Sequence, residues 1–197
     1  MKGLEQFEPD TYYHVVNHAV GNENLFKNDD NFSFFLRKYA SYMPSVCNTL
    51  AYCLMPNHIH FLIKIHSEET LLAHPKYKSD FHKLVMQELS NLLNSYAKAY
   101  NKMYNRKGSL WIDFTKRFSV KSDNYLSTVI NYIHQNPVKH GFTSQIEDWK
   151  YSSYNSILSE KPTLLCRNEV VSWFGSINDF KNYHQINDIN LFDDWEF

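Results

Sequence analysis

The sequence is poor in glycine, proline and cysteine and has no long apolar run. Its 197 residues include five glycines and six prolines, too few for a collagen-like or low-complexity chain. No apolar segment approaches the roughly 20 residues that a membrane-spanning helix needs. Because the first residues, Met1–Gln6, also lack an apolar signal region, we expect a cytoplasmic protein. The chain does have 43% hydrophobic and 16% aromatic residues, which is enough to build a packed core.

Three scattered cysteines, Cys47, Cys53 and Cys166, form no closely spaced pair. A disulfide framework and a zinc site made of thiolates both need such pairs, so neither is indicated. We expect the cysteines to be small buried side chains.

Charge is nearly balanced over the whole chain but not along it. The formal net charge is −1, which argues against a generally basic nucleic-acid-binding protein. Within Tyr96–Lys121, however, seven basic residues stand against a single acidic one, Asp113. Such a segment can supply a phosphate-binding surface, although the solvated face of a helix gives the same pattern.

Hydrophobic spacing and turn residues predict alternating strands and helices. β-Branched and aromatic runs indicate strands, and apolar residues three and four apart behind a polar cap indicate helices. The expected strands are Tyr12–Val20, the two halves of a hairpin over Val46–Ile65 that turns at Pro56-Asn57, and Phe118–Val120. The expected helices run from Asp29 to Met43, from a cap at Ser79 or Asp80 to the break at Gly108, and over Tyr125–Gln135. Asp123 or Asn124 would cap the last helix, and Pro137 would end it.

This order, β-α-β-β-α-β-α, predicts an α+β protein. Its first six elements form the ferredoxin-like βαββαβ arrangement, an antiparallel sheet with helices on one face, and the seventh is an added helix. No linker separates a second domain, so we expect one domain over residues 1–143. Residues 144–197 are expected to form a short C-terminal extension of small helices packed on the same domain.

The pattern His58-Ile59-His60 places two imidazoles on one face of a strand. Side chains at i and i+2 leave a strand on the same side, about 6.6 Å apart. Both rings can therefore bind one divalent ion, with a third ligand from elsewhere in the chain. Two histidines beside a turn can equally be surface or hydrogen-bonding residues.

Tyr132 and Asn136 are four residues apart in the last expected helix. This spacing puts a phenol and an amide oxygen on one helix face, roughly 6 Å apart at Cβ. The pair can join a nucleophile to a metal ligand. Each residue also has a plainer interpretation, Tyr132 as a packed aromatic and Asn136 as the residue that closes the helix before Pro137.

Several motifs occur together and in a fixed order. The run 54–62, Leu-Met-Pro-Asn-His-Ile-His-Phe-Leu, resembles the histidine–hydrophobe–histidine strand of the HUH single-tyrosine transposases. The run 132–138, Tyr-Ile-His-Gln-Asn-Pro-Val, is similar to the tyrosine helix of that family. Shorter matches are Tyr13-His14-Val15, Gly108-Ser109-Leu110-Trp111 and the run 149–154. From about residue 12 to 154 the chain resembles the REP-associated tyrosine transposases, the single-copy chromosomal members of this group.

The resemblance implies metal-dependent nicking and rejoining of single-stranded DNA next to a hairpin. Tyr132 would be the nucleophile that forms a 5′-phosphotyrosine, and His58, His60 and Asn136 would bind Mg²⁺ or Mn²⁺. His134 is a candidate for accepting the phenol proton. The protein would be a monomer or a homodimer, associated with the nucleoid when bound to DNA. The expected phosphate contacts lie in the basic segment: Lys98, Lys102, Arg106, Lys107, Lys116 and Arg117.

Two other functions stay open at this point. The same fold could be a nucleic-acid-binding module that has lost catalysis. Alternatively, the two histidines could belong to a metal hydrolase that uses no tyrosine, with further ligands drawn from His14, His18 or His66.

Overall fold

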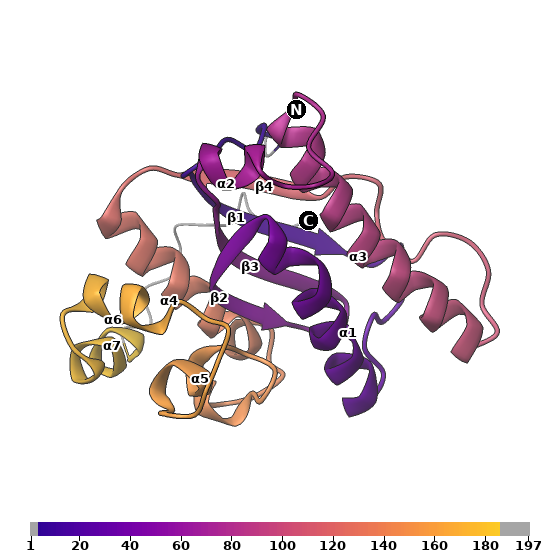
Figure 1. The fold of residues 1–197 in the computed structure, drawn as a ribbon. Coiled ribbons are helices and arrows are strands. Elements are labelled where there is room, and N and C mark those ends of the chain that lie inside the picture. The colour runs from indigo at the N-terminus through magenta and orange to yellow at the C-terminus, as the bar shows by residue number, and fades with distance from the viewer. Residues whose placement is uncertain (1–3, 186–197) are drawn as a thin grey trace.

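The computed structural model describes residues 4–185, which form a four-stranded sheet covered by helices on both faces (Figure 1). The strands are β1 (Tyr12–His18), β2 (Cys47–Leu54), β3 (His58–Ile65) and β4 (Lys116–Val120). They pair in the order β2-β3-β1-β4, and every pairing is antiparallel. This confirms the predicted α+β class with an antiparallel sheet.

Two helices on one face and four on the other enclose the sheet. Helices α1 (Asp29–Tyr42) and α3 (Phe81–Met103) pack together over one face, where Val15, Phe61 and Ile63 are buried. A short 3₁₀ turn (Met43–Ser45) follows α1, and α2 (Glu68–Leu72) precedes α3. Leu62 and Phe118 point to the opposite face. The elements there are α4 (Asp123–Lys139), a 3₁₀ turn (Ile146–Asp148), α5 (Tyr154–Leu158), α6 (Arg167–Phe174) and α7 (Ile177–His184). In Figure 1, α4–α7 are grouped apart from α1 and α3.

Local capping explains where the long helices begin. The Asp80 carboxylate accepts a hydrogen bond from Lys83 N at 2.9 Å, so α3 starts at one of the two caps that the sequence indicated. Helix α4 differs from the prediction, because its N-cap is Ser122 rather than Asp123 or Asn124.

Helix α4 also continues past Pro137, where the sequence predicted its end. Proline inside a helix removes one hydrogen bond and crowds the carbonyl four residues earlier, at a cost of about 3 kcal/mol. Here Pro137 is buried, and the helix ends two residues later at Lys139. The backbone N–H of Phe142 donates to Pro137 O at 2.8 Å, and Gly141 turns with a positive φ of 71°. Packing and a well-bonded helix end thus outweigh the local penalty.

The C-terminal extension covers the exposed edge of the sheet. Ser153 N donates to Tyr52 O at 2.9 Å, and Cys166 N donates to Thr49 O at 2.9 Å. Edge strands expose unpaired backbone groups that invite association, and these bonds occupy part of the β2 edge. Cys47 and Cys53 are buried, and all three cysteines are free thiols. Among the described residues, no helix is both long and apolar enough to cross a membrane.

A directed chain of hydrogen bonds joins the last helix to α4 and β2. His184 Nδ1 donates to Phe180 O (2.7 Å), so His184 Nε2 accepts from His134 Nδ1 (2.8 Å). His134 Nε2 in turn accepts from Ser153 Oγ (2.7 Å), which accepts from Tyr52 N (2.9 Å). The chain requires both rings to be neutral. Burial accordingly lowers the pKa of His184 to about 4 and that of His134 well below its usual value.

We therefore expect stability to fall in mild acid. A histidine with a lowered native pKa contributes fully above its unfolded pKa of about 6.5, and this contribution is lost as pH falls towards the native value. For His184 alone, the free energy of unfolding should drop by about 1 kcal/mol between pH 7 and pH 5.5. Urea unfolding at several pH values measures this drop. The non-titrating variant His184→Gln should show a shallower pH dependence, and an unchanged slope would contradict the assignment.

Candidate active site

Strand alternation places two pairs of histidines on the sheet face below α4. On β3, Ile59 and Phe61 point into the core beneath α1 and α3, so His58 and His60 point the other way. On β1, His18 lies opposite His58 in the antiparallel register, and His14 lies diagonal to His60. The rings stack in pairs, His18 on His58 with centroids 5.5 Å apart and His14 on His60 at 5.2 Å.

Helix α4 brings Tyr132 and Asn136 to this histidine face. The Tyr132 ring meets the ring of His60 edge-on at 5.7 Å and that of His14 at 5.8 Å. The Asn136 side chain lies close enough to His58 to act on its pKa. The four residues singled out from the sequence therefore meet within one chain, and Tyr132 and Asn136 are both fully buried.

Several buried polar atoms at this meeting point make no hydrogen bond among the described residues. They include His60 Nε2 and Asn136 Oδ1, together with Nδ1 of the neighbouring His14. The Asn136 amide is oriented by its own helix, because Nδ2 donates to Tyr132 O at 2.8 Å. That bond leaves Oδ1 as the atom that faces away from the helix. Unsatisfied buried polar atoms are costly, so such atoms indicate a missing partner.

Burial keeps the two β3 histidines neutral. It is the main cause that lowers the pKa of His58 to about 3, with smaller effects from His140 and His18 and an opposing one from Asn136. Burial also lowers the pKa of His60 well below its usual value, and the neighbouring histidines add to the effect. A neutral imidazole offers a lone pair, which is the form that binds a metal ion.

The donor set is two imidazole nitrogens and one amide oxygen. Within residues 4–185, no three side chains drawn from histidine, cysteine, aspartate and glutamate are arranged to hold a metal ion. A site that uses His58 and His60 therefore needs a ligand of another type, and Asn136 is in place to supply it. Imidazole and amide donors together suit first-row divalent ions such as Mn²⁺.

Comparisons with known proteins show which chains are similar in sequence and in fold. No family model matches the sequence. The Haemophilus influenzae protein named "Putative REP-associated tyrosine transposase" is 28% identical over 109 residues, which are 54% of this chain and 58% of that protein. The chain thus spans less than two thirds of this relative's length. The solved structure of a REP-associated tyrosine transposase bound to a REP hairpin superposes with a TM-score of 0.63 at 14% identity, covering 82% of this chain and 89% of that one.

The sequence is thus similar to a putative REP-associated tyrosine transposase over about half of its length. Its α+β fold, with a four-stranded antiparallel sheet, is shared with the solved REP-associated tyrosine transposase.

One role expected from the sequence is wrong. His134 lies about 200° around the helix axis from Tyr132, and both of its ring nitrogens are hydrogen-bonded, one to His184 and one to Ser153. A ring that is hydrogen-bonded at both nitrogens within the core has no position left to take the phenol proton. His134 is therefore a structural residue that ties α4 to the extension.

Aromatic side chains beside the site were missed by sequence reasoning. His140, at the end of α4, lies 5.1 Å from the His58 ring between centroids, and Phe142 follows at 6.5 Å from His140. Phe142 is 44% exposed and also neighbours Trp149 at 5.8 Å. Their only sequence signal was their position directly after the Tyr132–Val138 motif. They give the site an aromatic rim that could stack on nucleobases.

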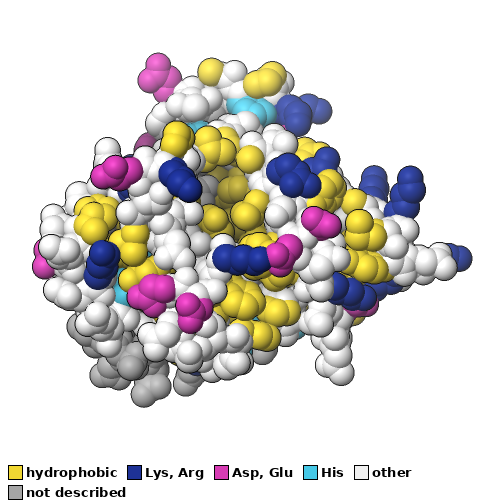
Figure 2. Space-filling model, turned by 90° about the horizontal axis from the view of Figure 1, so that it is seen from below, with side chains coloured by type: hydrophobic (Ala, Val, Ile, Leu, Met, Phe, Trp, Pro, Cys, Tyr) yellow, Lys and Arg dark blue, Asp and Glu magenta, His cyan; other side chains and the backbone are white. Residues whose placement is uncertain are grey.

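The basic segment does not form one surface. Figure 2 shows positive and negative side chains interspersed on one face of the molecule, around a hollow lined by hydrophobic side chains. Lys107 is exposed and Lys116 half-buried. Lys98 and Lys102 line a groove of about 660 Å³ with Lys38, Phe34 and Tyr42, between α1 and α3. The sheet separates this groove from the histidine face.

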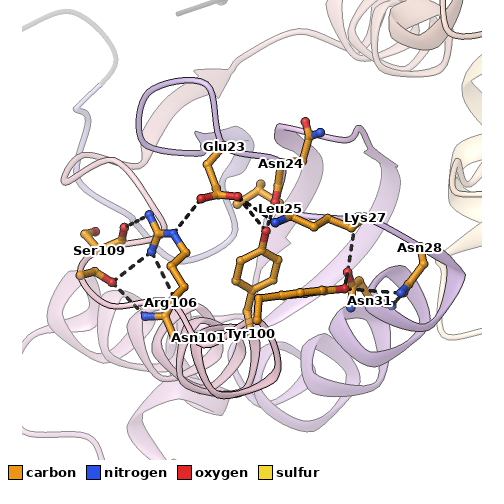
Figure 3. A network of polar contacts seen from close by, with 12 residues as sticks. Glu23, Asn24, Leu25, Lys27, Asn28, Asn31, Tyr100, Asn101, Arg106 and Ser109 are labelled. Carbon is orange, nitrogen blue, oxygen red and sulfur yellow. Dashed lines mark hydrogen bonds and ion pairs between the residues drawn. The ribbon is translucent and has the colours of Figure 1, made fainter.

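Both arginines of the predicted set have their guanidinium groups hydrogen-bonded within the protein, Arg106 half-buried and Arg117 buried. Arg106 bonds Glu23 at 2.8 Å and also donates to Asn101 and to the carbonyls of Gly108 and Ser109 (Figure 3). Arg117 is buried, and its guanidinium donates to the carbonyls of Leu4, Glu5 and Thr115. Sequence charge alone could not distinguish such internal arginines from phosphate-binding ones.

We predict that Arg117→Ala destabilises the fold by about 3 kcal/mol, because it removes charge-assisted hydrogen bonds in a buried place. Chemical denaturation measures the loss. The control Lys107→Ala removes an exposed charge from the same sequence segment and should change stability by no more than about 0.5 kcal/mol. Equal effects of the two substitutions would show that Arg117 is not an internal anchor.

Proposed function

We propose that this protein nicks and rejoins single-stranded DNA through a 5′-phosphotyrosine formed on Tyr132. The observation that carries the proposal is the packing of the Tyr132 ring on His60, with Asn136 Oδ1 and His60 Nε2 both lacking partners among the described residues. Together they offer a nucleophile beside an incomplete donor set, which is the combination that phosphoryl transfer to a phenol needs.

His58, His60 and Asn136 would hold a divalent ion, Mn²⁺ or Mg²⁺. When bound, such an ion would offset the negative charge of a phosphodiester and help to orient it. The residues fit this role because both histidines are buried and neutral and the Asn136 amide already has its nitrogen bonded to the helix. The nitrogen ligands favour Mn²⁺ over Mg²⁺, which prefers oxygen.

Tyr132 would supply the covalent step. Its phenol oxygen loses its proton to water and forms a bond to phosphorus, while the bond from phosphorus to the 3′ oxygen breaks. That oxygen takes up one proton and leaves as a hydroxyl, so the step has no net change in protons. The phosphotyrosine keeps the energy of the broken linkage. A 3′-hydroxyl can therefore attack it in the reverse step and rejoin the strand without a nucleotide cofactor.

The burial of Tyr132 adds a condition to this reaction. The side chain has no exposed surface, so a DNA phosphate can reach it only after the segments around it move. Before DNA binds, the exclusion of water keeps the histidines neutral. When the strand enters, its phosphodiester would take the place of part of the protein that covers Tyr132.

The proposed substrate is a single strand next to a hairpin. The solved family member was bound to a REP hairpin, and this chain shares its fold. The exposed Lys107 and the groove lysines Lys98 and Lys102 are the predicted phosphate contacts that the structure leaves accessible. His140 and Phe142 would stack on bases near the cleaved phosphate. Because all four site residues come from one chain, a monomer suffices, and the protein would act at the nucleoid in the cytoplasm.

A covalent adduct tests the proposal. Wild-type protein incubated with Mn²⁺ and labelled hairpin-bearing single strands should give a protein–DNA band that survives denaturation. Tyr132→Phe keeps the ring and its packing but lacks the oxygen, so we expect DNA binding without any adduct. The control Tyr125→Phe changes an exposed tyrosine of the same helix and should leave the adduct at the wild-type level.

An adduct formed by Tyr132→Phe would remove Tyr132 from the role of nucleophile. Strand binding without an adduct in the wild-type protein, across varied hairpin sequences, would favour the alternative of a non-catalytic nucleic-acid-binding module.

Metal dependence is a separate prediction. EDTA should abolish adduct formation in the wild-type protein, and added Mn²⁺ should restore it, because phosphate charge opposes attack by the phenol oxygen. In His58→Ala, Mn²⁺ should give less than about one hundredth of the wild-type rate, since a ligand is lost. The control His66→Ala replaces a histidine at the far end of β3 and should behave like the wild-type protein. Full activity in EDTA would contradict a metal-dependent mechanism.

A further inference from the structure

The two β3 histidines each present one ring nitrogen to a partner outside the proposed ligand set. His58 Nδ1 lies 2.8 Å from Asn57 Oδ1, in the turn between β2 and β3. His60 Nδ1 lies 3.0 Å from His14 Nε2, on the neighbouring strand β1. In both cases the contacted nitrogen is Nδ1, so Nε2 is the atom that remains for the site.

Proton counting decides what each contact can do. An amide oxygen only accepts, so His58 Nδ1 must carry the hydrogen and His58 Nε2 the lone pair. Between His60 and His14 one neutral ring donates and the other accepts. If His14 donated, the His60 hydrogen would sit on Nε2, and if His60 donates, the His14 hydrogen sits on Nδ1; the structure shows no hydrogen bond among the described residues at either atom. Only donation by His60 leaves the lone pair on His60 Nε2, as the proposed ligand role requires.

We infer that His14 and Asn57 are positioning residues that fix His60 and His58 as Nδ1–H tautomers, with both Nε2 lone pairs directed into the site. The inference rests on the proposed function, which selects the tautomer of His60, but both tautomers can be measured in the metal-free chain. His14 is well placed to hold its partner rigidly, because it is fully buried and its ring is within 8° of parallel to that of His60. Outer hydrogen bonds of this kind set the direction and basicity of a histidine ligand.

The two partners hold the histidines by different means. Asn57 is half-buried in a turn of the chain next to its own histidine, so its position depends on local geometry. His14 reaches His60 across the pairing of β1 with β3, so its position depends on the register of the sheet. Substitutions at Asn57 and at His14 therefore give two independent tests, each with one variant that removes the acceptor and one that keeps it.

The first measurement is the tautomer of each ring in metal-free protein labelled with ¹⁵N-histidine, read from long-range ¹H–¹⁵N spectra. We expect His58 and His60 to carry hydrogen on Nδ1 at neutral pH. In His14→Gln the amide oxygen replaces the accepting nitrogen, so His60 should stay an Nδ1–H tautomer. In His14→Leu the acceptor is gone, and His60 should become a mixture of tautomers. An Nε2–H tautomer of His60 in the wild-type protein would overturn the inference.

The second measurement is the affinity for Mn²⁺ by titration calorimetry, without DNA. His14→Leu and Asn57→Ala should each weaken binding 10- to 100-fold, as loss of an outer partner does elsewhere. His14→Gln and Asn57→Asp, which keep an acceptor, should stay within about threefold of the wild-type protein. Equal losses for the Leu and Gln variants would overturn the positioning role of His14. Because Asn57 lies in a turn, its variants decide the question even where His14→Leu disturbs the core.

The two proposals fail in different ways. If the wild-type tautomers are as stated but no Mn²⁺ binds, the metal-dependent function is wrong. The inference that His14 and Asn57 fix the two tautomers then still stands. If Mn²⁺ binds but the tautomers of His58 and His60 do not depend on Asn57 and His14, the positioning inference is wrong and the proposed function stands.

Discussion

The antiparallel register of β1 and β3 is the constraint on which the whole site depends. It sets His18 opposite His58 and His14 diagonal to His60, so four imidazoles share one face of the sheet. A shift of one residue in this register would turn His14 and His18 to the other face, into the core beneath α1 and α3. That core, with Val15, Phe61 and Ile63 buried in it, therefore also holds the histidines in place. The geometry of the site follows from the apolar pattern of the opposite face.

The sequence predicted the parts of the molecule that follow periodic rules. Alternation along β3 and the four-residue spacing of Tyr132 and Asn136 were enough to assign both pairs to single faces, and the structure brings the two faces together. The antiparallel sheet followed from the order of the elements along the chain. These features depend on neighbours within a few residues or on general rules of chain topology. Such periodic patterns carry little information about which residue, distant in sequence, a side chain will contact.

Long-range partners account for the expectations that were wrong. Arg117 lies in a basic segment, but three carbonyl groups, two of them from the N-terminal segment, take up its donors. His134 lies in the tyrosine motif, but its partners are 50 and 19 residues away in sequence. Pro137 is a strong local signal for a helix end, and buried contacts overrule it. In each case the sequence showed what the residue type can do, but not which distant residues surround it in the fold.

The extension has a direct physical connection to the proposed chemistry. α7 bonds α4 through His134 and Gln135, whose Nε2 donates to His184 O at 2.6 Å. Both residues lie between Tyr132 and Asn136 in the sequence, and His134 points to the opposite side of the helix, about 200° around the axis from Tyr132. These bonds fix the rotation of α4 about its axis, and this rotation decides whether Tyr132 and Asn136 meet the histidines. A helix with proline near its end has one backbone bond fewer to resist twisting. The extension is therefore part of what holds Tyr132 and Asn136 against the sheet.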